Sequence, residues 1–266
     1  MPDTTPDLPL PVIALVGAPD WAAQVSPPLA AHSFAPQRVP KRTGYINWLV
    51  DHYTVLVLID ADSTSGWAEW VTTTKTEQAT RRIPVLVTGQ DRALQTEAAT
   101  VGADFFIPAD ELDEYLMPQV TARARILSPE AREELACQCG EPLPPLAQVG
   151  VRKFNAGAYY AQHDAFEEQW MAETGPVREL YRGILQVGVA YYHISKGNYN
   201  GGVKMLRRSV QWLATLPDVC QGVDVRQLRQ DSAAVRAALE AMNPEDIRAF
   251  DRSLFKPVRW ADSQDS

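Results

Sequence analysis

The amino-acid sequence predicts an α/β domain built on a five-stranded parallel sheet, followed by an all-α helical bundle. Over residues 10–126, short apolar runs alternate with helix-length amphipathic segments, which is typical of a parallel sheet covered by helices on both faces. Over residues 151–257 the segments are of helix length and short turns join them, which indicates an antiparallel bundle. Residues 127–150 contain the run PLPP and are expected to form a proline-rich linker.

Five apolar runs give the predicted strands of the α/β domain. They cover residues 11–16, 34–38, 54–59, 83–87 and 105–107. The third run is the clearest, because its aliphatic residues (VLVLI) follow one another without a polar interruption, as in strands buried on both faces. Helices are expected between and after these strands, over residues 20–31, 46–51, 67–79, 91–101 and 110–126.

Three segments of this domain, VLVLIDAD, IPVLVTG and GADFFIP, resemble the receiver domain of bacterial response regulators. The resemblance covers residues 10–126 and implies a flavodoxin-like sheet of five parallel strands. It also implies that Asp60 stands where the family has its phosphoryl-accepting aspartate, and Thr88 where the family has the hydroxyl that senses the phosphoryl group.

Phosphoryl transfer in such a pocket also needs magnesium, which receivers hold with an acidic pair after the first strand. The corresponding turn has one acid, Asp20, which lies beyond the usual position, and Ile107 replaces the lysine expected before Pro108. The sequence therefore predicts a degenerate receiver-like domain in which Asp60 caps a strand end or a helix. Docking of a partner, dimerisation, or binding of a small ligand at the carboxyl ends of the strands are its expected remaining roles.

Composition and charge argue against several functional classes. The formal net charge of −8 does not suit a surface that coats nucleic acid or anionic lipid. No apolar stretch approaches the roughly 20 residues of a spanning helix, and no basic region precedes an apolar segment at the start, so we expect a cytoplasmic protein without a membrane partner. Cys137, Cys139 and Cys220 are too few for a disulfide framework and are expected to be reduced thiols.

The helical part begins after the proline run. Helices are predicted over residues 152–173, 177–195, 200–216 and 223–242. Gly175 and Pro176 mark the first turn, because glycine caps a helix end and proline suits the first turn of the next helix. The second helix is apolar almost all round, which marks it as buried.

Two segments of this part, FNAGAYYAQHDAFEEQW and GILQVGVAYYHISKGNYNGG, resemble a bacterial helical family catalogued as domain of unknown function 309. The residues that match its pattern are His163, Glu167, Trp170, Gln186, Gly197 and Asn198. Asp164 stands where the family usually has glutamate, and Ala161 where it usually has another acid. The resemblance implies a helical fold and no defined activity.

Helical spacing gathers part of this set. His163, Glu167 and Trp170 follow one another at i, i+4 and i+7, so they share one stripe of the first predicted helix. If the first two helices fold back about Gly175, Gln186 lies level with His163. We therefore expect His163, Glu167 and Gln186 to form a buried polar centre.

Three weaker candidates lie around that centre. Asp164 and Glu168 point to the neighbouring stripe of the first helix. His193 lies seven residues beyond Gln186, or about 10 Å farther along the second helix, and is expected at a different level.

Three interpretations of the centre stay open. It can be a structural hydrogen-bond network, a metal site in which His163 and Glu167 supply two ligands, or an acid–base or small-ligand site in which Glu167 raises the basicity of His163. No nucleophile motif, phosphate-binding loop or cofactor fingerprint accompanies it, although a divalent metal is compatible with the residues.

The function predicted first is that of a cytoplasmic regulatory or interaction protein, with a protein or a second copy of the chain as partner. The alternative is a metal-dependent or acid–base enzyme centred on His163 and Glu167.

Overall fold

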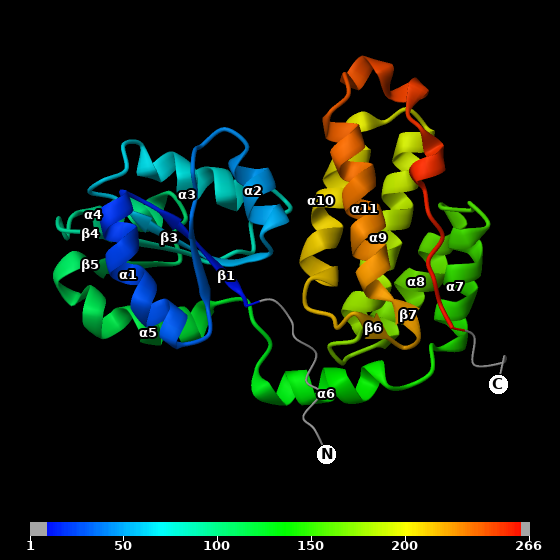
Figure 1. Cartoon of the computed structure of the whole chain (residues 1–266), viewed down its shortest axis with the longest axis horizontal. Helices are drawn as coiled ribbons and strands as arrows, with labels where there is room; N and C mark the ends of the chain where they lie inside the picture. Colours follow the sequence, from blue (N-terminus) through cyan, green and yellow to red (C-terminus); the bar gives the residue numbers. More distant parts are fainter. Residues whose placement is uncertain (1–9, 262–266) are drawn as a thin grey trace. The chain divides into compact units, whose positions relative to one another are not determined.

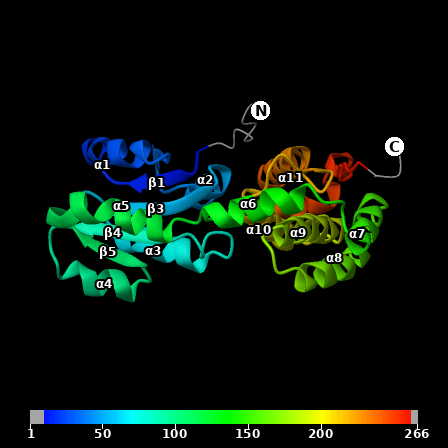
Figure 2. The ribbon, with the colours of Figure 1, turned by 90° about the horizontal axis from the view of Figure 1, so that it is seen from below.

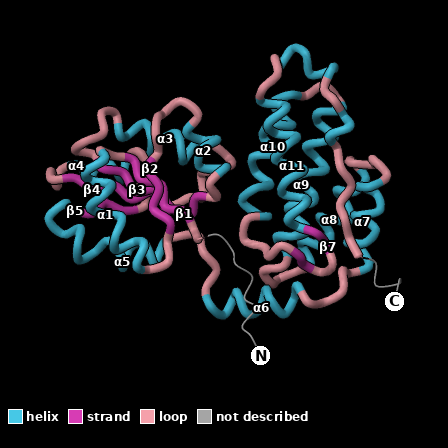
Figure 3. The backbone as a smooth tube through the Cα atoms, viewed as in Figure 1, coloured by secondary structure: helices cyan, strands magenta, loops and turns pink. Residues whose placement is uncertain are grey.

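The computed structural model describes residues 10–261, and these form two compact units, residues 10–126 and residues 127–261 (Figure 1). The first unit contains a five-stranded sheet, and the second is helical apart from one short hairpin (Figure 3). The predicted fold class, an α/β domain followed by a helical bundle, is confirmed. Within the described residues, no helix is long and apolar enough to cross a membrane.

The sheet of the α/β unit is parallel throughout, in the order β2-β1-β3-β4-β5. Its strands are β1 (Val12–Val16), β2 (Ala35–Arg38), β3 (Thr54–Asp60), β4 (Val85–Gly89) and β5 (Phe105–Pro108). This is the flavodoxin-like order, in which the chain reverses direction across the sheet at β1 and β3. The carboxyl ends of β1 and β3 therefore flank the crevice where such sheets bind ligands.

Five helices cover the two faces of the sheet (Figure 2). They are α1 (Pro19–Ala31), α2 (Tyr45–Asp51), α3 (Trp67–Thr76), α4 (Leu94–Thr100) and α5 (Leu112–Arg123). Helices α1 and α5 pack on one face, and α2, α3 and α4 on the other. The alternation of side chains along β3 sends Leu56 and Leu58 to the first face and Val57 and Ile59 to the second, which explains the uninterrupted apolar run.

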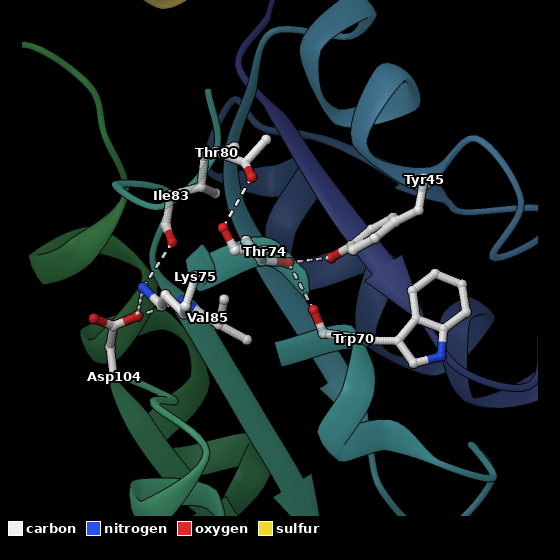
Figure 4. A network of polar contacts seen from close by, with 8 residues as sticks. All are labelled: Tyr45, Trp70, Thr74, Lys75, Thr80, Ile83, Val85 and Asp104. Atoms are coloured by element: carbon white, nitrogen blue, oxygen red, sulfur yellow. Dashed lines mark hydrogen bonds and ion pairs between the residues drawn. The ribbon is translucent and has the colours of Figure 1, made fainter. Parts of the chain in front are cut away.

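A polar network fixes α3 at the amino end of β4 (Figure 4). The Tyr45 hydroxyl lies 2.8 Å from that of Thr74, and burial raises the pKa of Tyr45 above its usual value. Lys75 donates to the carbonyl of Ile83 at 2.9 Å and pairs with Asp104 at 2.5 Å. These contacts satisfy polar groups next to the sheet, and they engage Lys75 at the end of the strands opposite to Asp60.

The helical unit packs six helices and a two-stranded hairpin around one apolar core. The helices are α6 (Pro129–Cys139), α7 (Pro145–Asn155), α8 (Ala161–Ala172), α9 (Arg178–Ser195), α10 (Tyr199–Leu213) and α11 (Val225–Glu240). The hairpin is β6 (Val219–Cys220) with β7 (Val223–Asp224), and two short 3-10 helices, Pro244–Ala249 and Arg252–Leu254, follow α11. Helix α9 is central: Tyr181, Ile184 and Tyr191 are fully buried, as its apolar sequence predicts.

The expected linker, residues 127–150, is part of the helical unit rather than an extended spacer. It holds α6 and the start of α7, and Leu135 and Leu143 are buried in the core. The Ser128 hydroxyl accepts a hydrogen bond from the Ala131 amide at 3.2 Å and so caps α6. The proline run ends at the first turn of α7, where the missing N–H of Pro145 costs no helical hydrogen bond, so proline starts a helix here.

The single helix expected over residues 152–173 is two helices. Helix α7 ends at Asn155, and Gly157 takes a left-handed conformation, with φ of +74°, before α8 begins. The Asn155 side chain exchanges two hydrogen bonds, at 2.8 and 2.9 Å, with the backbone of Val258. Asn155 is the last residue of α7, and its partner lies 103 positions along the chain, a contact that local sequence does not reveal.

The cysteines also differ from expectation. Cys139 at the end of α6 and Cys220 in β6 form a disulfide, and Cys137 remains an exposed free thiol. The two bonded residues are 81 positions apart, so only the packing of the β6–β7 hairpin against α6 brings them together.

Candidate functional site

Asp60 is the last residue of β3, beside the carboxyl end of β1. Its side chain is buried, and its own loop holds both carboxylate oxygens. One oxygen accepts a hydrogen bond from the Asp62 amide at 3.2 Å, and the other accepts one from the Ser63 hydroxyl. Ser63 in turn accepts a hydrogen bond from the Ala18 amide at 2.9 Å, which ties this loop to the turn after β1. Asp60 therefore caps the loop that follows β3.

The other receiver-like positions are only partly assembled. Thr88 pairs with Asp60 across β3 and β4, and its buried hydroxyl has no hydrogen-bond partner among the described residues. Asp20 is exposed at the start of α1, and no hydrogen bond or ion pair in the described structure joins it to Asp60. A Cβ on Gly17 would lie 2.5 Å from the ring of Trp21 and 3.0 Å from the Cβ of Asp60, so Trp21 packs closely over this turn.

The predicted centre of the helical unit is more exposed than expected. His163 keeps 36% of its side chain exposed, and its Nδ1 lies 3.5 Å from a carboxylate oxygen of Asp164 and 3.8 Å from one of Glu167. Both carboxylates are themselves well exposed, and Glu168 is on the surface. The side chains of His163, Asp164 and Glu167 form an open cluster on α8. Across residues 10–261, no group of three or more His, Cys, Asp and Glu side chains is placed to hold a metal.

Gln162 occupies the buried position that His163 was expected to take. It is fully buried, and its amide donates to the carbonyls of Tyr159 and Leu185 at 3.1 and 3.2 Å. A Cβ on Gly188 would lie 2.5 Å from the Gln162 amide nitrogen, so the absence of a side chain at Gly188 lets the two helices meet. The buried face of α8 is thus one residue out of phase with the prediction, because the packing of α8 on α9 places Gln162 against Leu185.

Gln186 is buried on α9, and its side-chain oxygen has no hydrogen-bond partner in the described part of the chain. No hydrogen bond among residues 10–261 joins it to His163 or Glu167. His193 lies apart, next to Asn198 and Gly201 at the start of α10. Burial and the neighbouring charge of Lys204 lower its pKa, so the neutral imidazole is favoured there.

Trp170 belongs to a stacked cluster that sequence reasoning missed. The guanidinium of Arg182 lies 4.9 Å from the ring centre of Trp170 and 3.6 Å from that of Trp212. Arg182 is largely buried and pairs with Glu179 at 3.7 Å. The guanidinium of Arg178 lies 5.4 Å from a ring centre of Trp170. The cluster joins α8, α9 and α10. The sequence feature that could have indicated this cluster is the pair Arg178 and Arg182, at i and i+4 on an otherwise apolar helix.

Replacing Arg182 by lysine is expected to lower the free energy of unfolding by about 1 to 2 kcal/mol, because a lysine ammonium cannot stack as a plane between two indole rings. Urea unfolding followed by circular dichroism measures the change. Arg152→Lys, on the exposed side of α7, is the matched control and should leave stability unchanged. Equal stability of the two variants would show that the stack contributes nothing.

Comparison with known proteins gives different matches for the two units. Residues 147–205 match the family model described as domain of unknown function 309. An uncharacterised protein of Aquifex aeolicus (strain VF5) is 24% identical over 96 residues, which cover 36% of this chain and 29% of that protein. The matched part of the chain thus spans less than a third of the length of that relative.

Solved structures of response regulators resemble the α/β unit. A putative response regulator from Chloroflexus aurantiacus J-10-fl is 15% identical, with a TM-score of 0.38, and the match covers 44% of this chain and 99% of that one. The N-terminal receiver domain of Klebsiella pneumoniae RstA is 13% identical, with a TM-score of 0.37, over 43% of this chain and 97% of that one. The chain combines an α/β unit built on a five-stranded parallel sheet with a helical unit in which residues 147–205 match the family model described as domain of unknown function 309.

Proposed function

We propose that this protein is a regulatory or interaction protein whose α/β unit binds a protein partner, or a second copy of the chain, instead of accepting a phosphoryl group. The observation that carries the proposal is the environment of Asp60. Both of its oxygens are engaged by the amide of Asp62 and the hydroxyl of Ser63, so neither is presented to an incoming phosphoryl group.

The surroundings of Asp60 support the same conclusion. Magnesium-dependent phosphoryl transfer draws on several carboxylate oxygens around one cation. Asp20 is exposed, and no hydrogen bond or ion pair within residues 10–261 joins it to Asp60. Ile107 occupies the place before Pro108 where a lysine would meet the transferred group. Folds often outlast the chemistry of their sites, and a receiver fold without that chemistry still offers a stable surface for binding.

Incubation with acetyl phosphate and magnesium is expected to leave the intact mass of the protein unchanged. The measurement is mass spectrometry of the wild-type chain, with Asp60→Asn as the matched variant and a functional receiver domain as the positive control. A stable mass increase of one phosphoryl group that disappears in Asp60→Asn would overturn the proposal.

An enzyme centred on His163 is the second candidate. The observation in its favour is that His163 Nδ1 lies within 4 Å of carboxylate oxygens of both Asp164 and Glu167 on an accessible face of α8. A histidine beside carboxylates suits general acid–base catalysis or the binding of a divalent metal. The open geometry supplies few ligands, so we rank this candidate below an interaction protein.

Elemental analysis distinguishes these candidates. Protein purified without chelators is expected to contain no stoichiometric zinc, iron or manganese, and His163→Ala is expected to match it in metal content and in stability. Stoichiometric metal that is lost in His163→Ala would favour the enzyme.

A cytoplasmic location stays a prediction. It requires the bond between Cys139 and Cys220 to be compatible with a compartment that keeps most thiols reduced.

A further inference from the structure

We propose that the disulfide between Cys139 and Cys220 is a reversible thiol–disulfide exchange site, opened by a dithiol reductant, and that it controls how firmly α6 is anchored to the helical unit. Helix α6 is the first helix after the α/β unit in the chain, and Cys139 is its last residue. Cys220 is in the β6–β7 hairpin, which packs against α6. The bond therefore ties the end of α6 to a distant part of the fold.

The two bonded cysteines differ in accessibility, which decides which sulfur an incoming thiolate can attack. Cys220 is fully buried, whereas Cys139 is only partly buried at the end of an exposed helix. An incoming thiolate must approach along the axis of the sulfur–sulfur bond and expel the far sulfur. Attack at Cys139, with Cys220 as the leaving group, is the approach that this arrangement allows.

A third thiol stands beside the bond. Cys137 is exposed and lies two residues before Cys139 on α6. Cysteines that report redox state often have a second thiol close by that resolves a mixed disulfide. A dithiol donor carries its own second thiol, so the exchange does not require Cys137.

Hydrogen bonds, in addition to the disulfide, join the end of α6 to the β6–β7 hairpin. The amide of Gln221 donates to the carbonyl of Cys139 at 2.8 Å, and its side chain donates to the carbonyl of Gln138 at 3.3 Å. The Gln138 side chain accepts a hydrogen bond from the amide of Val177 at 3.1 Å, and Tyr181 donates to the Gln221 side chain at 2.9 Å. These contacts, with the buried Leu135, predict that the reduced protein keeps its fold while the end of α6 loosens.

The exchange has two steps. In the first, a thiolate of the external dithiol bonds to the Cys139 sulfur, the bond to Cys220 breaks, and the Cys220 thiolate takes up a proton. The second thiol of the donor then attacks the mixed disulfide and releases Cys139 as a thiol. The protein gains two hydrogen atoms and two electrons, and the donor becomes a disulfide. The reverse reaction with an oxidised dithiol restores the bond.

Hydrogen–deuterium exchange of the full chain, with and without dithiothreitol, tests the proposal. Reduction without denaturant is expected to speed amide exchange at residues 134–139 by at least about tenfold, while amides of α9 stay protected. Alkylation before and after reduction should count one and then three free thiols. Cys220→Ala should reproduce the reduced pattern without reductant, and Cys137→Ser should respond to dithiothreitol as the wild type does.

Two results would overturn the proposal. Three free thiols in protein handled without reductant, under oxidising conditions, would show that the bond does not form. A bond that dithiothreitol cannot open until the whole unit unfolds would show a permanent structural crosslink. Because reduced wild-type protein carries no substitution, the test stands even if Cys220→Ala fails to fold.

Discussion

Replacing Phe166 by alanine is expected to lower the free energy of unfolding of the helical unit by about 4 kcal/mol. Phe166 is fully buried on α8, and its ring lies directly over Gly150 of α7: a Cβ on Gly150 would lie 2.7 to 2.8 Å from three ring atoms. No side chain at Gly150 can move into the space that the ring vacates. The cavity therefore stays open, which places the cost near the upper end for large-to-small substitutions in a core.

Denaturant unfolding followed by circular dichroism at helical wavelengths measures this effect. Met171→Ala is the matched control, because Met171 is on the same helix and is 70% exposed. It should change stability by less than about 0.5 kcal/mol. A similar, small effect of both substitutions would contradict the packing of α8 on α7.

Removing both bonded cysteines, as Cys139→Ala with Cys220→Ala, is expected to cost about 3 to 4 kcal/mol of stability. The crosslink closes a loop between residues 81 positions apart, for which the chain-entropy relation gives about 4.5 kcal/mol. We expect slightly less, because the relation overestimates the effect of a crosslink when the unfolded chain retains structure.

The measurement is the unfolding midpoint in guanidinium chloride under oxidising conditions. Cys137→Ser leaves the disulfide in place and is the matched control. The midpoint of the double variant should fall, and that of oxidised Cys137→Ser should not. Adding a reductant should lower the wild-type midpoint toward that of the double variant. Equal midpoints for all three oxidised proteins would refute the contribution of the crosslink.

The strands of the α/β unit could be predicted because their signal is local. Uninterrupted aliphatic runs such as the one in β3 require burial on both faces, and the helix-length segments between them require a parallel arrangement. The residue types beside Asp60, with one acid after β1 and Ile107 before Pro108, could also be read from the sequence, since they stand next to predicted strand ends. What the sequence could not show is that the Asp62 and Ser63 loop folds back to engage Asp60.

The helical site was harder to predict because its phase depends on distant contacts. Helices α7 and α8 are separate, and Gln162, not His163, takes the buried position on α8, where its amide reaches the carbonyl of Leu185 in α9. Spacing within α8 is unaffected by the break, so His163 and Glu167 do lie together. The predicted burial of His163 and Glu167 was wrong, since burial depends on which face of α8 packs against α9.

The stacked arginine and the disulfide share this limitation. Arg182 meets Trp170 and Trp212 from two other helices, and Cys139 meets a hairpin that follows α10. Each contact exists only after several helices have packed. Periodicity within one helix does not contain that information.

The central proposal, that Asp60 of the α/β unit does not accept a phosphoryl group, is tested most directly by nuclear magnetic resonance. Magnesium and beryllofluoride, which together imitate a bound phosphoryl group, would be titrated into the full chain while the amides of Ala61 and Thr88 beside Asp60 are monitored. We predict that neither amide shifts at concentrations that saturate a functional receiver. Saturable shifts of both amides that vanish in Asp60→Asn would contradict the account.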